Sequence, residues 1–294
     1  MFEKSRIYEI LRDTGVIDVS RVELYAPCVR DRDDVKAYRC ERSGVIFLDR
    51  TDHIGAQHYI EKDLSDWSFA VGEKQVQFVE LDNAERQMKR FGHLVEGKSW
   101  LDFGCGGADL LGLLGDKAKE AWGVEPTRWY ADSARAKGLN IVSSLEEFGD
   151  KRFDIITLFH VFEHLQEPLD VAVNLRERLN PGGILLLEVP HARDFLLNQL
   201  DSAEFRGFTL WSEHLVLHTR DSLTVMLKAA GFLDVDVTGV QRFPLSNHLY
   251  WLRHGKPGGH KIWASVDDPA LTKAYEEALA RNNATDTLVA IAKK

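Results

Sequence analysis

The sequence places two histidines and a glutamate in a pattern that could move a proton. His160, Glu163 and His164 follow an apolar, β-branched run at 153–159. An imidazole titrates near neutral pH, so it can take a proton from a hydroxyl or a carbon acid. Glu163 next to His164 could orient that ring or raise its basicity. These three residues are therefore candidate catalytic groups.

Two other interpretations of this segment stay open. The order His-x-x-Glu-His also matches the inverted zinc-protease motif, in which both histidines lie on one helix. Here His160 ends an apolar strand, so we expect neither a zinc hydrolase nor a bound metal. Alternatively, the histidines only shape a pocket or cap the next helix.

A glycine-rich turn at 104–107, within LDFGCGGADL, is a second candidate site. Glycines permit a tight turn and let a ligand approach the backbone closely. The helix that follows points its N-terminal amides at that ligand. Glu125 ends the next strand, 21 residues after Gly104, and its carboxylate could accept hydrogen bonds from two ribose hydroxyls.

The residues around this turn favour S-adenosylmethionine over a dinucleotide. A dinucleotide motif requires a small residue at the third position of G-x-G-x-x-G, where this chain has Asp109. An aspartate there would hinder close helix packing and repel a pyrophosphate. S-adenosylmethionine has no phosphate, and Asp102 would favour its cationic groups. The simpler alternative is an ordinary strand-to-helix turn with a surface glutamate.

The elements that must position these residues alternate regularly from residue 98. We expect strands at 98–103, 119–125, 139–143, 153–159, 184–189, 232–239 and 286–292, and helices at 108–115, 127–137, 166–179 and 220–230. Such alternation predicts an α/β fold, a Rossmann-like seven-stranded, mostly parallel sheet with helices on both faces. Ligands of such sheets bind at the carboxyl ends of the strands.

The chain divides into a small N-terminal extension at 1–70 and a core domain at 71–294. The extension contains a predicted hairpin at 36–48, and a helix at 72–94 leads into the core. The stretch 241–285 breaks the alternation and is interpreted as an insertion between the last two strands. Long insertions of this kind often serve as lids or binding loops.

Composition excludes several classes of protein. Of the 294 residues, 44% are apolar. The chain has 37 Lys and Arg and 46 Asp and Glu, which gives a net charge of -9. An acidic chain has no general electrostatic reason to bind nucleic acid. No apolar window of ~18 residues predicts a membrane span. The N-terminus carries charges throughout and does not resemble a signal peptide. Three widely spaced cysteines do not form a disulfide framework. We therefore expect a cytoplasmic protein.

Four segments taken together resemble the class I S-adenosylmethionine-dependent methyltransferases: LDFGCGGADL, GVEP at 123–126, FDIITLFHVFEHLQEP at 153–168 and LNPGGILLLEVP at 179–190. The resemblance covers about 95–240 and is strongest to the subgroup that modifies sugars and similar small molecules. It implies transfer of a methyl group that leaves S-adenosylhomocysteine. The cofactor-binding residues that it implies are Asp102, Phe103, Gly104, Cys105, Gly106, Gly107, Glu125, Pro126, Ser144, Leu145, Phe159 and His160. In sugar C-methyltransferases of this group, the Glu-His pair is linked to proton removal.

The N-terminal segment resembles a degenerate form of the zinc ribbon that precedes the core in many sugar C-methyltransferases. Tyr25 and Ser43 stand where each Cys-x-x-Cys pair would have a second cysteine, so only Cys28 and Cys40 remain. Two thiolates do not make a closed tetrahedral site. His53 or His58 could complete one, but we expect that the metal has been lost.

The expected acceptor is a small molecule or glycan: a sugar, nucleotide-linked or in a surface glycan, methylated at oxygen or carbon. Candidate acceptor-binding residues are His191, His214, Asn247 and Tyr250, and Tyr59 and Trp67 are candidates to cover the cofactor. The alternatives are an O- or N-methyltransferase of a non-sugar metabolite or natural product, and a non-catalytic protein that binds S-adenosylmethionine.

Overall fold

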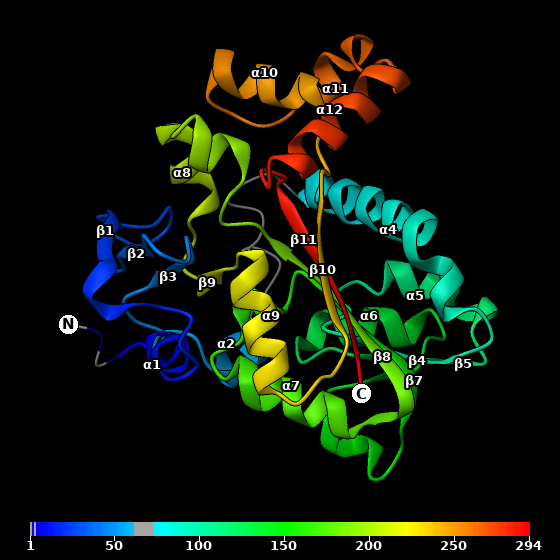
Figure 1. Cartoon of the computed structure of the whole chain (residues 1–294). Coiled ribbons are helices and arrows are strands. Elements are labelled where there is room, and N and C mark those ends of the chain that lie inside the picture. The colour runs from blue at the N-terminus through cyan, green and yellow to red at the C-terminus, as the bar shows by residue number, and fades with distance from the viewer. Residues whose placement is uncertain (1, 3, 62–72) are drawn as a thin grey trace.

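The computed structural model describes residues 2, 4–61 and 73–294. Trp67, a candidate to cover the cofactor, lies outside the described residues. Its central sheet has seven strands in the order β10-β11-β8-β7-β4-β5-β6 (Figure 1). Strand β11 is antiparallel to both neighbours and every other pair is parallel. The predicted Rossmann-like sheet is confirmed. The strands are β4 (Ser99–Phe103), β5 (Glu120–Val124), β6 (Ile141–Val142), β7 (Phe153–Phe159), β8 (Leu179–Pro190), β10 (Val235–Val240) and β11 (Thr287–Lys293).

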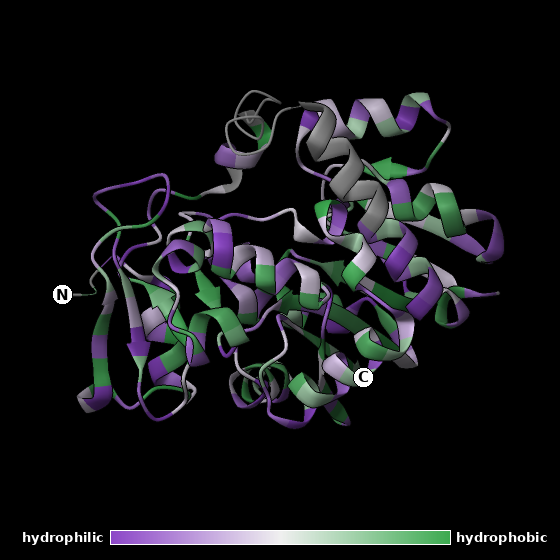
Figure 2. Cartoon of the chain, turned by 90° about the horizontal axis from the view of Figure 1, so that it is seen from above, coloured by the Kyte–Doolittle hydropathy of each residue, from purple (hydrophilic) through white to green (hydrophobic). Residues whose placement is uncertain are grey.

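Helices cover both faces of this sheet because successive strand residues point to opposite sides. Trp100 and Ile155 pack against the helices of one face, which are α4 (Glu73–Val95), α5 (Asp109–Leu114) and α6 (Arg128–Ala136). Leu101 and Ile156 pack against those of the other, α7 (Pro168–Glu177) and α9 (Arg220–Ala229). Figure 2 shows the apolar residues gathered along the strands and the inner sides of these helices.

One predicted boundary is wrong. The sequence predicts a helix that runs to residue 179 and is stopped by the Asn-Pro-Gly-Gly segment, but α7 ends at Glu177. Strand β8 already begins at Leu179, because that residue pairs with Phe153 of β7. Tertiary pairing with the neighbouring strand therefore overrides the local helical pattern.

The N-terminal extension forms an antiparallel sheet in the order β1-β2-β3-β9, beside the core (Figure 1). The predicted hairpin at 36–48 is present as β2 and β3. The fourth strand comes from far along the chain, where Val216 and Leu217 pair with Phe47 and Ile46. The extension is therefore joined to the core by backbone hydrogen bonds. Its elements are α1 (Arg6–Asp13), η1 (Val19–Arg21), β1 (Val22–Ala26), β2 (Ala37–Cys40), β3 (Ile46–Leu48), α2 (Ala56–Glu61) and the added β9 (Val216–Leu217).

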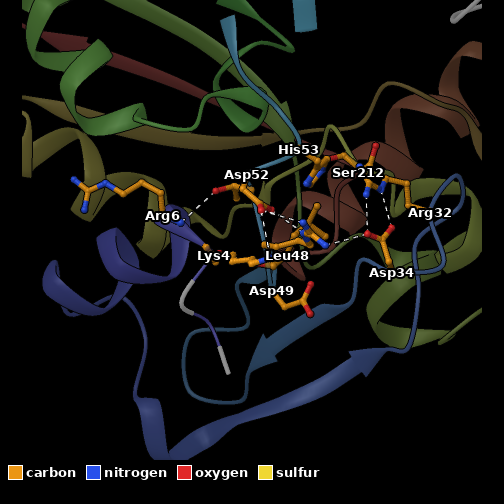
Figure 3. Close-up of polar contacts among 12 residues, drawn as sticks. Lys4, Arg6, Arg32, Asp34, Leu48, Asp49, Asp52, His53 and Ser212 are labelled. Atoms are coloured by element: carbon orange, nitrogen blue, oxygen red, sulfur yellow. Dashed lines mark hydrogen bonds and ion pairs between the residues drawn. The ribbon is translucent and has the colours of Figure 1, made fainter. Parts of the chain in front are cut away.

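Polar contacts also attach the extension to the segment before β9 (Figure 3). Asp31 accepts hydrogen bonds from the backbone N–H and the hydroxyl of Ser212, at 2.9 and 2.6 Å. His53 Nε2 donates to the carbonyl of Ser212 at 2.8 Å. Ser212 is thus held from two sides, which fixes the residues that follow it.

The insertion at 241–285 lies between β10 and β11 and is helical. It consists of α10 (Leu245–His254), α11 (Gly259–Ile262), η6 (Ala264–Val266) and α12 (Pro269–Arg281), gathered at one end of the molecule (Figure 1). The remaining short helices are η2 (Gly115–Lys117), η3 (Leu145–Phe148), η4 (Phe162–His164), η5 (Phe195–Gln199) and α8 (Ala203–Thr209). In the part of the chain that the structure describes, none of the helices is both long enough and apolar enough to cross a membrane.

The contribution of β9 to stability is testable at Leu217, which is 2% exposed in the core of the extension. Replacing Leu217 with Ala removes buried apolar contacts, so we expect the free energy of unfolding to fall by about 2–5 kcal/mol in urea denaturation. Leu233→Ala is the matched control, because Leu233 is 67% exposed and its loss should change stability by less than ~0.5 kcal/mol. Equal stabilities of the two variants would show that the junction is not packed as described.

Candidate functional site

The predicted glycine turn leads from β4 into α5 in a conformation that requires glycine. Gly104 and Gly106 have φ angles of 73° and 51°, in the left-handed region. A Cβ atom on Gly104 would lie 2.5 Å from Val161 Cγ2, so no side chain fits there. A Cβ on Gly106 would meet nothing within 4 Å, so open space lies beside the turn at that residue.

Glu125, directly after β5, points its carboxylate at this turn as predicted. Its Oε2 accepts a hydrogen bond from the backbone N–H of Gly106 at 2.9 Å, and its Oε1 accepts one from Thr127 at 2.8 Å. The residue is 6% exposed. These two backbone donors fix the carboxylate where the resemblance places the ribose of the cofactor.

Asp102 adds a second acidic group beneath the turn. It is 4% exposed, and its Oδ1 accepts a hydrogen bond from the Thr157 hydroxyl at 2.6 Å. The pKa of Asp102 is raised to about 7, because burial and the nearby Glu125 outweigh the lowering effect of the hydrogen bond from Thr157. Such acidic surroundings fit a cationic ligand without phosphates, which is the chemistry of S-adenosylmethionine.

The other predicted cofactor residues follow the carboxyl ends of neighbouring strands. Pro126 follows β5, Ser144 precedes η3 beyond β6, and Phe159 ends β7. Leu145 begins η3 and packs against the core, and the ring of Phe159 lies 5.8 Å from that of Phe91 on α4. Burial raises the pKa of the Cys105 thiol, so this cysteine is an unreactive part of the turn.

His160 lies at the end of β7 with a φ of 56° and is held by charged groups. Its Nδ1 lies 3.3 Å from Glu163 Oε1, and its Nε2 lies 2.6 Å from Arg242 Nη1 and 3.1 Å from Glu188 Oε1. Arg242 can only donate and Glu188 can only accept, so these two groups compete for Nε2. In both cases the two ring nitrogens face charged groups, which makes His160 a link between them rather than an open base.

Sequence reasoning missed the partners of His160. Glu188 is fully buried in β8, and Arg86 of α4 binds it with Nη1 3.0 Å from Oε2. Arg242 enters from the start of the insertion and also donates to Asn83 at 2.8 Å. The one available signal was a glutamate within the otherwise apolar run at 184–189.

Glu163 and His164 lie on η4 in a cluster that also contains His58, Glu213 and His214, here named the histidine–glutamate cluster. His164 Nε2 lies 3.8 Å from Glu163 Oε1, and its Nδ1 lies 3.7 Å from Glu213 Oε2. His58 Nε2 lies 2.9 Å from Glu213 Oε1, and the rings of His164 and His214 are 5.1 Å apart. Three distant segments of the chain meet here.

The charge states of this cluster follow from burial and mutual contact. Burial and the neighbouring His164 together lower the pKa of His214 to about 4, so His214 is neutral at pH 7. Burial raises the pKa of Glu163, but the imidazoles of His160 and His164 outweigh that effect and lower it to about 2. Glu163 is therefore an ionised carboxylate with no exposed surface.

Tyr59 of α2 connects the cluster with the glycine turn. Its hydroxyl is buried, and burial raises its pKa. Three carboxylates within electrostatic reach raise it further: Glu213, Glu163 and Glu125. A direct contact places the turn beside the cluster: a Cβ on Gly104 would lie 2.5 Å from Val161, which stands between His160 and Glu163 in the chain.

Three predicted acceptor residues lie outside the cluster, and their acceptor role stays a prediction. His191 is 1% exposed, and its Nδ1 donates to the carbonyl of Thr285 at 2.9 Å, because β8 carries it into the interior. Asn247 Oδ1 accepts from the backbone N–H of Gly258 at 3.2 Å. The ring of Tyr250 packs 5.0 Å from that of Trp263. Asn247 and Tyr250 thus connect the helices of the insertion. Of the four predicted acceptor residues, His214 lies in the cluster.

The predicted loss of zinc from the extension is still a prediction. Cys28 is exposed, Cys40 is buried, and both are free thiols. Within the described ranges, the group of metal-ligating side chains that lie close together is Glu163, His164 and His214, which includes neither cysteine.

Comparison with known proteins identifies a family. The model of the methyltransferase domain family matches residues 73–237, more than half of the chain. A ubiquinone biosynthesis O-methyltransferase of Coxiella burnetii is 28% identical over 172 residues, which cover 53% of this chain and 72% of the relative. A tRNA U34 carboxymethyltransferase of Pseudoalteromonas atlantica is 29% identical over 162 residues, which cover 50% of this chain and 48% of the relative.

Solved structures show the same fold. A methyltransferase from Archaeoglobus fulgidus that depends on S-adenosylmethionine aligns with a TM-score of 0.52 and 19% identity, over 79% of this chain and all 100% of that one. A possible histamine N-methyltransferase from Thermotoga maritima aligns with a TM-score of 0.53 and 15% identity, over 82% of this chain and 100% of that one. At these identities the likeness concerns the fold alone.

The role of Glu125 is testable by ligand binding. The carboxylate of Glu125 accepts hydrogen bonds from two backbone N–H groups. In Glu125→Gln, the NH2 group of the amide replaces one of these two acceptor oxygens. We expect the affinity for S-adenosylhomocysteine, measured by calorimetry, to fall ~10-fold or more. Glu177→Gln, an exposed change on α7, should bind like the wild type. Unchanged affinity in Glu125→Gln would exclude the proposed ribose contact.

The buried Asp102 predicts a pH dependence of stability. Its pKa is raised from 3.8 to about 7, so the folded chain holds a proton between these values that the unfolded chain has lost. Stability therefore falls as pH rises through this window, by up to about 1.4 kcal/mol per pH unit. Asp102→Asn lacks this titration, so its stability relative to the wild type should increase from pH 4 to pH 7 in denaturant titrations. A constant difference would contradict the raised pKa.

Proposed function

This chain belongs to the methyltransferase domain family and is an S-adenosylmethionine-dependent enzyme, and from this premise we propose that it methylates a hydroxyl oxygen of a small-molecule acceptor. The observation that carries the proposal is the buried histidine–glutamate cluster beside the cofactor turn. An amine acceptor needs little base chemistry, whereas a hydroxyl must lose its proton. A cluster in which the neutral ring of His214 and the ionised carboxylate of Glu163 both lie beside His164 supports the second case.

The residues of the cluster have separate roles in this methyl transfer. S-adenosylmethionine supplies a methyl group that is already activated by its sulfonium. His164 takes the proton of the acceptor hydroxyl, and Glu163 and Glu213 on either side of its ring stabilise the imidazolium that forms. The acceptor oxygen gains a bond to the methyl carbon while the bond from carbon to sulfur breaks. Glu125 and the glycine turn hold the nucleoside so that this displacement is aligned.

Two acceptor classes remain within this proposal. The resemblance to sugar methyltransferases supports a sugar hydroxyl, nucleotide-linked or in a glycan. The relative from Coxiella burnetii is named an O-methyltransferase of ubiquinone biosynthesis, which supports a non-sugar hydroxyl. Methylation at carbon is less well supported, because Tyr25 and Ser43 replace two ribbon cysteines of the C-methylating relatives.

The two acceptor classes are distinguished by assaying sugar nucleotides and phenolic metabolites in parallel and measuring the S-adenosylhomocysteine released. We expect turnover in one of these panels. If amines alone were methylated, oxygen transfer would be refuted. If S-adenosylhomocysteine bound but no acceptor in any panel were turned over, the non-catalytic alternative would be supported.

The role of His164 is testable with the best acceptor of that assay. Since Gln cannot take a proton, His164→Gln should lower kcat by ~10²–10⁴-fold while the affinity for S-adenosylhomocysteine stays within twofold or so. His93→Gln changes an exposed histidine at the end of α4 and should retain full activity. Retained turnover in His164→Gln would assign the cluster a purely structural role.

A further inference from the structure

Glu163, the carboxylate at the centre of the histidine–glutamate cluster, has an unusual environment for a buried side chain. It has no exposed surface, and neither of its carboxylate oxygens receives a hydrogen bond. The nearest imidazole nitrogens to Oε1 are those of His160 at 3.3 Å and His164 at 3.8 Å. Buried polar atoms in proteins normally have a partner, and an ion is one of the partners that such oxygens can take.

His214 is oriented as a metal ligand would be. Its Nδ1 lies 3.0 Å from the carbonyl oxygen of Thr209, which can only accept, so the proton is on Nδ1. Nε2 therefore keeps its lone pair. A hydrogen bond from one ring nitrogen to a backbone carbonyl, with the other nitrogen open, is the usual arrangement of a metal-bound histidine.

His164 lies between two carboxylates, at distances longer than a hydrogen bond. Its Nδ1 faces Glu213 Oε2 at 3.7 Å, and its Nε2 faces Glu163 at 3.8 Å. Glu213 is itself oriented by His58, whose Nε2 lies 2.9 Å from Oε1. One donor atom from each of Glu163, His164 and His214 lies within 4.8 Å of the others.

We propose that Glu163, His164 and His214 bind one divalent ion of the zinc class, which holds the acceptor hydroxyl as a further ligand. Two imidazole nitrogens and one carboxylate suit Zn²⁺, Co²⁺ or Fe²⁺, whereas Mg²⁺ and Ca²⁺ prefer oxygen alone. Three protein ligands leave a position open for an acceptor, as in catalytic zinc sites. This reverses the expectation of no metal from the sequence.

The inference rests on the proposed methylation of a hydroxyl, and the ion replaces His164 as the group through which that hydroxyl loses its proton. A divalent ion lowers the pKa of a bound hydroxyl, so the acceptor loses its proton to solvent on binding and is held as an oxyanion. That oxygen then forms the bond to the methyl carbon. In this state His164 serves as a ligand, and Glu213 is a positioning residue that acts through His164.

The test is a titration of chelator-treated protein with Co²⁺, followed by its visible d–d absorption and by displacement with Zn²⁺. We expect one saturable equivalent in the wild type, and an affinity at least ~10-fold lower in Glu163→Gln and His214→Gln. Glu213→Gln keeps all three ligands and should lower the affinity ~10–100-fold. His93→Gln, far from the cluster in sequence and exposed, should bind Co²⁺ like the wild type.

Calorimetry with S-adenosylhomocysteine confirms that each variant is folded, because the cofactor turn contains none of the three ligands. Absence of a saturable Co²⁺ spectrum in the wild type overturns the proposal, as does equal affinity in Glu163→Gln, His214→Gln and the wild type. If methylation of a hydroxyl proceeds at full rate after metal removal, the metal is refuted and the proposed function stands. If Co²⁺ binds at these residues but no hydroxyl acceptor is turned over, the site stands and the proposed acceptor fails.

Discussion

Buried carboxyl groups at the carboxyl edge of the central sheet are the constraint on which the site depends. Asp102, Glu125, Glu163 and Glu188 lie there with at most 6% exposure. A charge in the interior must be compensated, because an uncompensated one would cost more than the fold can supply. Burial favours the protonated form of Asp102, whereas two backbone N–H groups bind Glu125 and an arginine binds Glu188. Glu163 faces imidazoles instead.

The N-terminal extension completes the site rather than standing apart from it. It contributes His58 to the cluster and holds Ser212 between Asp31 and His53, directly before Glu213. Strand β9 then enters the sheet of the extension, so the segment that carries His214 is fixed at both ends. Since the cluster depends on these contacts, folding of the extension and formation of the cluster are coupled.

The sequence was sufficient for the features that arise from local pattern. Alternating apolar residues predicted the strands, and the glycine turn with Glu125 was placed correctly because both follow directly after strands. The cluster was only partly predictable, since His58, His164 and Glu213 come from segments far apart in the chain. The burial of His191 could not be predicted, because nothing local distinguishes a polar residue that follows a strand at the surface from one that turns inward.

A crystal structure with S-adenosylhomocysteine tests the central claim most directly, namely that the cofactor turn and the histidine–glutamate cluster form one active site. The account predicts that the ribose hydroxyls bind the carboxylate of Glu125 and that the sulfur faces His164 across a space large enough for an acceptor. A nucleoside bound away from Glu125, or a sulfur directed away from the cluster, would contradict it.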